Sequence, residues 1–200
     1  MLRKLLNLLK KGEDVVYIEG ERCYIRTFIE EDARSLTDLV SQNKYYWATY
    51  EPLHRQEYYT IETQYKKILE SLHLMRSKRE FSFGIYINGT KRLIGHISLY
   101  AIKRMPYSSG FVGYSVDEKY IGQGIATEAL ELVKTFAFTE AQLHRIEAYV
   151  SPKNVPSIRV IEKAGFVREG LLRKLLFING SWEDHYMYAL LQEDYLKSIK

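Results

Sequence analysis

Cysteine is nearly absent from this chain, because Cys23 is the only one among 200 residues. A single cysteine excludes an intramolecular disulfide and a cysteine-rich metal site, and it is typical of the reducing cytoplasm. The histidines show no spacing of the kind that binds a metal ion, so we predict no metal site. They are His54, His73, His96, His144 and His185.

Long apolar runs and long basic runs are absent as well. Residues 1–11 combine leucines with basic residues, but they lack the uninterrupted apolar core and the cleavage site of a signal peptide. They are also too short to span a bilayer. The net charge of +4 is mild and argues against nucleic acid as a partner. We interpret residues 1–20 as a basic amphipathic extension that packs on its own domain or on a partner subunit in preference to a membrane.

No linker rich in proline, glycine or serine divides the rest of the chain, so residues 21–196 are predicted to form one domain. The predicted strands cover residues 22–29, 80–87, 92–102, 110–116, 144–150, 166–177 and 182–191. The predicted helices cover residues 30–42, 60–78, 125–140 and 154–164. A helix separates strand 110–116 from strand 144–150, and these two strands should therefore be parallel. The aromatic segment 43–56 is irregular and either lines a substrate entrance or covers the core.

A glycine loop joins strand 110–116 to the helix that begins near Ile125. Gly122 and Gly124 leave room for an anion close to the backbone N–H groups that a helix start leaves without partners. The helix dipole adds a positive end at the same place. A phosphate is therefore the expected ligand of residues 120–126, with Lys119 as a mobile charge. The alternative is that both glycines only turn the chain.

Three motifs together resemble the GNAT superfamily of acyl-CoA N-acyltransferases. They are the loop at 119–126, the segment 154–166 and the pair Glu169-Gly170, and the closing residues 179–184 resemble the RimJ/RimL branch of ribosomal-protein N-terminal acetyltransferases. The resemblance implies an α+β fold in three layers. Its central sheet is mixed and mostly antiparallel, with a splayed parallel strand pair and flanking helices.

The same resemblance implies that acetyl-CoA is the acetyl donor. Its pyrophosphate would bind the glycine loop, and the backbone near 114–116 would hold the thioester and its oxyanion. Ser157 would protonate or stabilise the departing thiolate, or else be a plain first-turn helix residue. The implied coenzyme contacts are Tyr114, Ser115, Val116, Lys119, Tyr120, Ile121, Gly122, Gln123, Gly124, Ile125, Ala126, Asn154 and Arg159.

The acceptor would be an amine that attacks the thioester directly through a tetrahedral intermediate. An α-amine with a pKa of about 7.7–8.0 is often neutral near pH 7.5, whereas a lysine amine near 10.4 is neutral about once in a thousand. The position at which RimL-like proteins carry a glutamate falls on Leu176, so the general base is not evident. Glu147 is our first candidate for the general base, and Glu183 and His185 are the other candidates. A weak base favours a protein N-terminus, such as that of a ribosomal protein.

Three other interpretations stay open at this point. A dinucleotide-binding module shares the Gly122 and Gly124 spacing, although Thr127 replaces its third glycine. A non-catalytic protein of this fold would bind acetyl-CoA and regulate or assemble a partner. An acetyltransferase of small amines would accept a polyamine, an aminoglycoside or an amino acid. A homo-oligomer is compatible with each interpretation.

Overall fold

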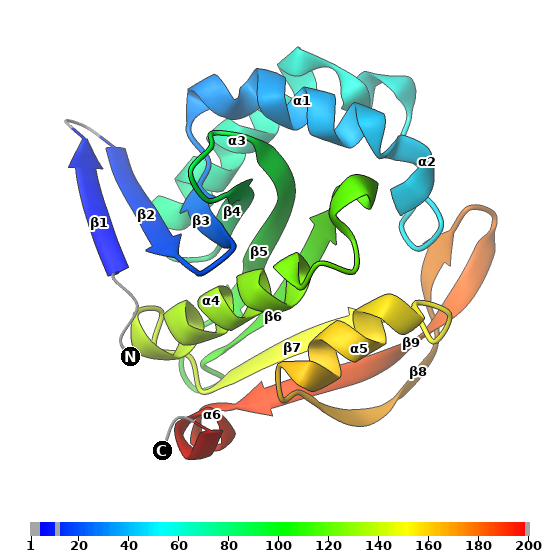
Figure 1. Cartoon of the computed structure of the whole chain (residues 1–200). Helices are drawn as coiled ribbons and strands as arrows, with labels where there is room; N and C mark the ends of the chain where they lie inside the picture. The colour runs from blue at the N-terminus through cyan, green and yellow to red at the C-terminus, as the bar shows by residue number, and fades with distance from the viewer. Residues whose placement is uncertain (1–4, 11–12, 199–200) are drawn as a thin grey trace.

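A single mixed sheet organises the computed structural model, which describes residues 5–10 and 13–198. The described strands lie in the order β1-β2-β3-β4-β5-β6-β7-β9-β8, and all neighbours are antiparallel except β6 and β7 (Figure 1). Their bounds are β1 Leu5–Lys10, β2 Glu13–Glu19, β3 Cys23–Thr27, β4 Phe81–Ile87, β5 Leu93–Lys103, β6 Ser109–Val116, β7 Arg145–Val150, β8 Val167–Ile178 and β9 Ser181–Leu191. The predicted α+β class and the parallel pair are confirmed.

Helices cover the sheet between these strands. The α-helices are α1 Ala33–Gln42, α2 Lys44–Trp47, α3 Ile61–Arg76, α4 Ile125–Thr139, α5 Val155–Lys163 and α6 Gln192–Ser198. Short 3-10 helices are η1 Glu30–Asp32, η2 Gln56–Tyr59 and η3 Glu118–Tyr120. Among the described residues, no helix is long and apolar enough to cross a membrane.

The two faces of β4 show how the layers form. Side chains alternate along a strand, and Phe83 packs edge-on against Phe136 of α4 at 5.6 Å between ring centroids. Tyr86 points to the opposite face, where its hydroxyl donates to Asp32 at the start of α1 over 3.2 Å. The helices α1 and α3 therefore cover one face of the sheet, and α4 covers the other. The buried side chains between these layers form one continuous core.

The N-terminal strands differ from the expected extension. Leu5–Lys10 pairs with β2, and β2 pairs with β3 at Tyr17–Arg26, Ile18–Ile25 and Glu19–Tyr24. The sheet thus continues across the boundary predicted at residue 20, and the part of the extension at Leu5–Lys10 is a strand of the sheet. Residues 1–4, 11 and 12 of the extension lie outside the described residues. A leucine pattern with doublets fits a helix and a strand equally well, and the pairing with a distant strand decides between them.

A buried carboxylate joins these strands to α4. Glu128 accepts hydrogen bonds from the backbone N–H groups of Glu21 and Arg22, the latter over 3.0 Å, and it is 7% exposed. Both N–H groups belong to the turn between β2 and β3. The first turn of α4 is thereby fixed against the edge of the sheet, next to the glycine loop.

Glu128→Ala is expected to lower the free energy of unfolding by about 2–4 kcal/mol, because two partly buried backbone N–H groups lose their charged acceptor. Glu62→Ala is the matched control, since Glu62 also lies in the first turn of its helix but is exposed and pairs only with Lys66. Urea unfolding of both variants measures the difference. Equal stabilities of the two variants would contradict the role of Glu128.

Candidate active site

The glycine loop lies where β6 passes into α4. Gly122 and Gly124 have φ angles of +73° and +79°, which an L side chain rarely adopts. Gly124 is the N-cap residue of α4 and accepts the first helical hydrogen bond, from Glu128 N–H over 3.0 Å. A Cβ built on Gly122 would meet no atom within 4 Å, so the space beside this backbone is open. The loop therefore has the open backbone and the helix start that a phosphate group needs.

A gap opens between β6 and β7 directly beside this loop. The two strands pair only at Ser109–Arg145, Gly110–Ile146 and Phe111–Glu147, and β7 pairs with β9 along its whole length. The part of β6 from Val112 to Val116 thus has no strand neighbour on that side among the described residues. Unpaired backbone N–H groups at such an edge are available to a ligand. The predicted splay of the parallel pair is confirmed.

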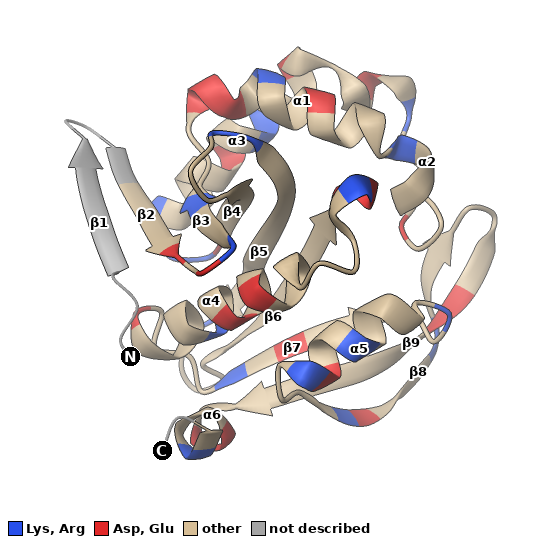
Figure 2. Ribbon diagram, in the orientation of Figure 1, with Lys and Arg blue, Asp and Glu red and all other residues tan. Residues whose placement is uncertain are grey.

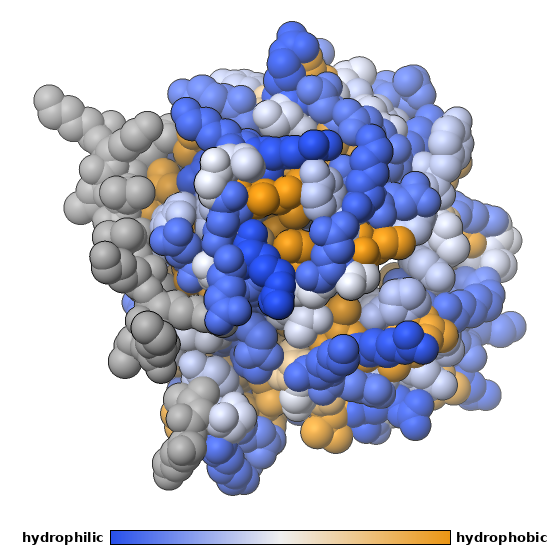
Figure 3. Space-filling model, in the orientation of Figure 1, coloured by the Kyte–Doolittle hydropathy of each residue, from blue (hydrophilic) through white to orange (hydrophobic). Residues whose placement is uncertain are grey.

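A cleft of about 540 Å³ occupies this gap. Figure 3 shows apolar side chains across the middle of the same face, between α1 above and α5 below. The cleft is lined by Tyr46, Trp47, Tyr50, Glu51, Tyr114, Ser115, Val116, Tyr120, Ile121, Gly122, Gly124, Ile125, Ala126, Thr127, Asn154, Pro156, Ser157, Arg159, Val160 and Lys163. Most of the predicted coenzyme contacts lie together in this cleft.

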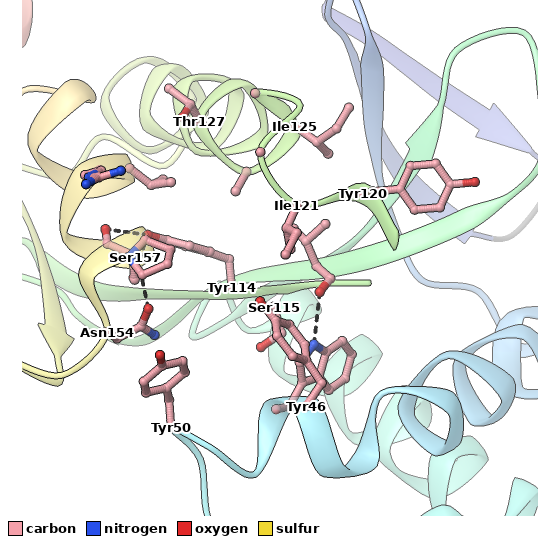
Figure 4. Close-up of a pocket in the computed structure, with 18 of the residues that line it drawn as sticks. Tyr46, Tyr50, Tyr114, Ser115, Tyr120, Ile121, Ile125, Thr127, Asn154 and Ser157 are labelled. Atoms are coloured by element: carbon pink, nitrogen blue, oxygen red, sulfur yellow. Dashed lines mark hydrogen bonds between the residues drawn. The ribbon is translucent and has the colours of Figure 1, made fainter. Parts of the chain in front are cut away.

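A pair of hydroxyl groups stands on the α5 side of the cleft. The Tyr114 hydroxyl lies 2.9 Å from Ser157 Oγ, and Asn154 Oδ1 accepts the Ser157 N–H over 3.1 Å as the cap of α5 (Figure 4). Burial raises the pKa of Tyr114 to about 12, against the opposing effect of the Ser157 hydrogen bond. The phenol is therefore protonated at neutral pH, and the pair can donate a proton.

A carboxylate stands on the other face of β6. Because side chains alternate along the strand, Ser115 points away from Ser157, and its hydroxyl donates to Glu51 Oε1 over 2.5 Å. Burial raises the pKa of Glu51, while the hydrogen bond from Ser115 and the charge of Lys67 act in the opposite direction. The cleft thus passes through the gap in the sheet, with hydroxyl groups on one face and a carboxylate on the other.

The segment that carries Glu51 is held from two sides. Trp47 Nε1 donates to the Val116 carbonyl over 3.0 Å, which ties the segment to the end of β6. Asn179, in the turn between β8 and β9, donates to the Ala48 carbonyl over 2.6 Å and accepts from Leu53 N–H over 2.9 Å. Segment 43–56, which we call the entrance segment, was expected to be irregular, but its residues 44–47 form α2. It meets both expected roles, because four of its residues line the cleft and Trp47 also packs against the core.

Several predicted residues lie outside the cleft. Lys119 and Gln123 do not line it, and the Gln123 amide instead donates to the Lys119 carbonyl over 3.0 Å. The basic side chains that do line it, Arg159 and Lys163, come from α5, whose Lys and Arg residues are visible in Figure 2. Only Arg159 of these two was predicted.

Glu147, the predicted base, is the main departure from expectation. It is absent from the cleft lining and accepts a hydrogen bond from Arg145 over 2.5 Å, and Arg145 also pairs with Glu169. Glu147 is therefore held in an ion-pair group on β7, outside the residues that line the cleft. Glu183 pairs with Lys153 instead, and His185 is buried in β9 outside the cleft.

Glu51 is the residue that sequence reasoning missed. It lies in a segment with no repeating pattern, and its partner Ser115 is 64 residues away. The only indication in the sequence is a single acid among the tyrosines of segment 43–56. Among the described residues, no group of three or more His, Cys, Asp or Glu side chains could hold a metal ion.

Comparison with known proteins agrees with this geometry. The family model for the acetyltransferase (GNAT) domain matches residues 22–167. A relative from Bacillus subtilis, the probable N-acetyltransferase YjcK, is 42% identical over 88% of this chain and 98% of its own length.

Two solved structures are similar to this chain in both sequence and fold. The ribosomal-protein-S5-alanine acetyltransferase of Vibrio fischeri is 32% identical, with a TM-score of 0.86 over 90% of this chain and 98% of its own. Mycobacterium smegmatis RimJ, solved in complex with CoA-disulfide, is 26% identical, with a TM-score of 0.80 over 88% of each chain. The chain therefore belongs to the GNAT family of N-acetyltransferases, which use acetyl-CoA as the acetyl donor.

Proposed function

We propose that this chain acetylates the N-terminal α-amino group of a protein, such as a ribosomal protein in the cytoplasm. The observation that carries the proposal is the cleft through the sheet. It has a glycine loop with an open backbone and hydroxyl donors on one face, and an aromatic entrance with a half-buried carboxylate on the other. The two substrates can thus approach the gap beside β6 from opposite faces.

On the donor side, the backbone N–H groups of 122–126 would take the pyrophosphate, and Arg159 and Lys163 would add positive charge. The Asn154 amide, already the cap of α5, would contact the pantetheine arm. A backbone N–H of the unpaired stretch of β6, in 114–116, would donate to the oxyanion of the tetrahedral intermediate. These roles use groups that line the cleft.

When the C–S bond breaks, the thiolate of coenzyme A needs a proton. Ser157 would donate it from Oγ, with Tyr114 as the hydrogen-bonded partner that replaces the proton. In many members of the superfamily a tyrosine farther along this helix protonates the thiolate, and here Ile161 occupies that place and is fully buried. Ser157, at the start of the same helix, would thus supply the proton in its place, supported by Tyr114 of β6.

The acceptor assignment rests on the basicity of amines and on the relatives. About one α-amine in six to eleven is neutral at pH 7, whereas a lysine amine is neutral far less often. The Vibrio fischeri protein, at 32% identity, is named for an alanine of ribosomal protein S5. An exposed protein N-terminus has both the required pKa and an extended shape that can enter an aromatic opening.

Two measurements test the proposal in sequence. Calorimetric titration should give saturable binding of acetyl-CoA and no binding of NAD. Thiol release should then be fast with a peptide that begins with a free alanine, and absent with the same peptide blocked at its N-terminus but carrying an internal lysine. Acetylation of spermidine in preference to the free peptide would overturn the acceptor assignment. Absence of acetyl-CoA binding would overturn the function altogether.

A further inference from the structure

We propose that Glu51 is the general base of the reaction and the group that binds the acceptor ammonium before it takes its proton. This inference rests on the proposed function. It assigns the unidentified base to a residue of the entrance segment, whereas Glu147 on β7 and the other carboxylate considered, Glu183, are both held in ion pairs away from the cleft.

The position of Glu51 carries the argument. Its Oε1 is fixed by the hydroxyl of Ser115, the central residue of the stretch that would hold the thioester. Among the described residues, its Oε2 has no hydrogen-bond donor, and the side chain lines the cleft. One carboxylate oxygen is thus oriented by the protein, and the other is left for an incoming N–H group. A base must lie within reach of the proton it removes, and this geometry satisfies that need.

The walls around Glu51 suit a cation. Tyr46, Trp47 and Tyr50 line the same end of the cleft. Figure 4 shows Tyr46 and Tyr50 on the cleft side of the entrance segment, with Ser115 above them. Aromatic faces attract an ammonium group, and a half-buried carboxylate among them adds a charge attraction that water screens only in part. The pocket therefore favours a small cationic head such as an α-ammonium group.

The other titratable groups near Glu51 do not provide an alternative base. Lys67 of α3 acts on Glu51 by its positive charge. Burial lowers the pKa of His96 to about 4, which makes it a weak base, and His96 packs against Trp47 outside the lining of the cleft. Burial and Lys67 also lower the pKa of His54, which stacks on Tyr58 and does not line the cleft either. Lys44, His54, Tyr58 and Tyr59 line a small pocket together with Glu51, and Tyr46 and Tyr50 line the main cleft with it. Ser115 donates a hydrogen bond to Glu51, and Lys67 acts on it by charge.

The proton balance of the reaction is then complete. Glu51 takes one proton from the acceptor ammonium, and the nitrogen lone pair forms the C–N bond to the thioester carbon. As the oxyanion returns to a carbonyl, the C–S bond breaks. Glu51 passes the first proton to water, then takes the second proton from the nitrogen of the intermediate and passes that to water as well. The thiolate gains its proton from Ser157, then Tyr114 returns a proton to Ser157, and water returns one to Tyr114. One proton is thus released in total for each ammonium acetylated.

Glu51→Gln is expected to reduce kcat/KM by about tenfold at pH 7 and by little at pH 9. Without the base, turnover waits for an amine that is already neutral, about one in ten at pH 7 and nearly all at pH 9. Rates of thiol release with the alanine peptide, measured from pH 6 to pH 9, give this ratio. Glu57→Gln is the matched control, because Glu57 lies in the adjacent exposed η2 and should keep wild-type rates.

Ser115→Ala provides a second and independent test. The Ser115 hydrogen bond lowers the pKa of Glu51, so its loss should raise that pKa and move the acid limb of the rate profile to higher pH. A loss in Glu51→Gln that is equal at every pH, or an acid limb that does not move in Ser115→Ala, would overturn the inference. Acetyl-CoA affinity, measured on each variant, should stay unchanged. Loss of acetyl-CoA binding in the wild-type protein would instead show that the proposed function has failed.

Discussion

Gly122→Leu is expected to weaken acetyl-CoA binding by about a thousandfold, which corresponds to about 4 kcal/mol. The side chain would fill the open space beside the loop, where a phosphate has to approach the backbone N–H groups. Each hydrogen bond to a charged group contributes about 1.5–3 kcal/mol, so losing two of them accounts for the effect. Calorimetric titration with acetyl-CoA measures it directly.

A substitution at another glycine distinguishes a loss of acetyl-CoA binding from the cost of backbone strain. Gly89, between β4 and β5, has a φ angle of +72°, and a Cβ built there also meets no atom within 4 Å. Gly89→Leu should therefore show the same cost in stability, about 1–2 kcal/mol for a left-handed backbone, with unchanged acetyl-CoA affinity. If both variants bind acetyl-CoA like the wild-type protein, the loop is only a turn and the assignment of the pyrophosphate site is wrong.

Ser157→Ala is expected to reduce kcat by about 100-fold while the Kd for acetyl-CoA changes by less than about threefold. The substitution removes only the hydroxyl, because the backbone N–H that Asn154 caps is kept and α5 stays intact. The comparison of thiol-release kinetics with calorimetric Kd values separates loss of the proton donor from loss of coenzyme binding. Ser181→Ala, at the start of β9, is a control outside the cleft and should be neutral.

Substitution of Tyr114, the hydrogen-bond partner of Ser157, adds a further measurement to this test. Tyr114→Phe should lower kcat by about tenfold, because Ser157 loses one hydrogen bond and its source of a replacement proton. The double variant should be no slower than Ser157→Ala alone, since both residues act in one step. Additive losses would mean that the two hydroxyl groups act separately, and unchanged turnover in Ser157→Ala would leave Ser157 as a structural residue of α5.

Local patterns were sufficient for most of the fold. Alternation predicts β4 to β7, helical periodicity predicts α3 and α4, and Gly165, with a φ angle of +87°, ends α5 as expected. Each of these signals depends on residues within one turn or one strand of each other. The strands β1 and β2 were not predicted, because their identity depends on pairing with β3. The final helix α6 was also missed, since only seven residues carry its pattern.

The candidate site also has a part that local sequence predicts and a part that it does not. The glycine loop, Asn154 and Ser157 form short motifs, so the donor side could be predicted from the resemblance. The acceptor side depends on contacts between segments far apart in the chain, such as Ser115 with Glu51. A carboxylate becomes a candidate base through its burial and its partners, and neither can be predicted from the residues next to it in the sequence. Glu147 was chosen for its strand, where alternation puts Arg145 on the same face, but the ion pair between Arg145 and the distant Glu169 could not be foreseen.

The hydrogen bonds of Asn179 bear on the order in which the parts of the molecule fold during synthesis. This residue holds the entrance segment at Ala48 and Leu53, which leave the ribosome well over a hundred residues earlier. In a nascent chain that lacks the final hairpin, the entrance segment has nothing to hold it from that side. The half of the cleft that we propose selects the acceptor is therefore completed only when β8 and β9 are in place.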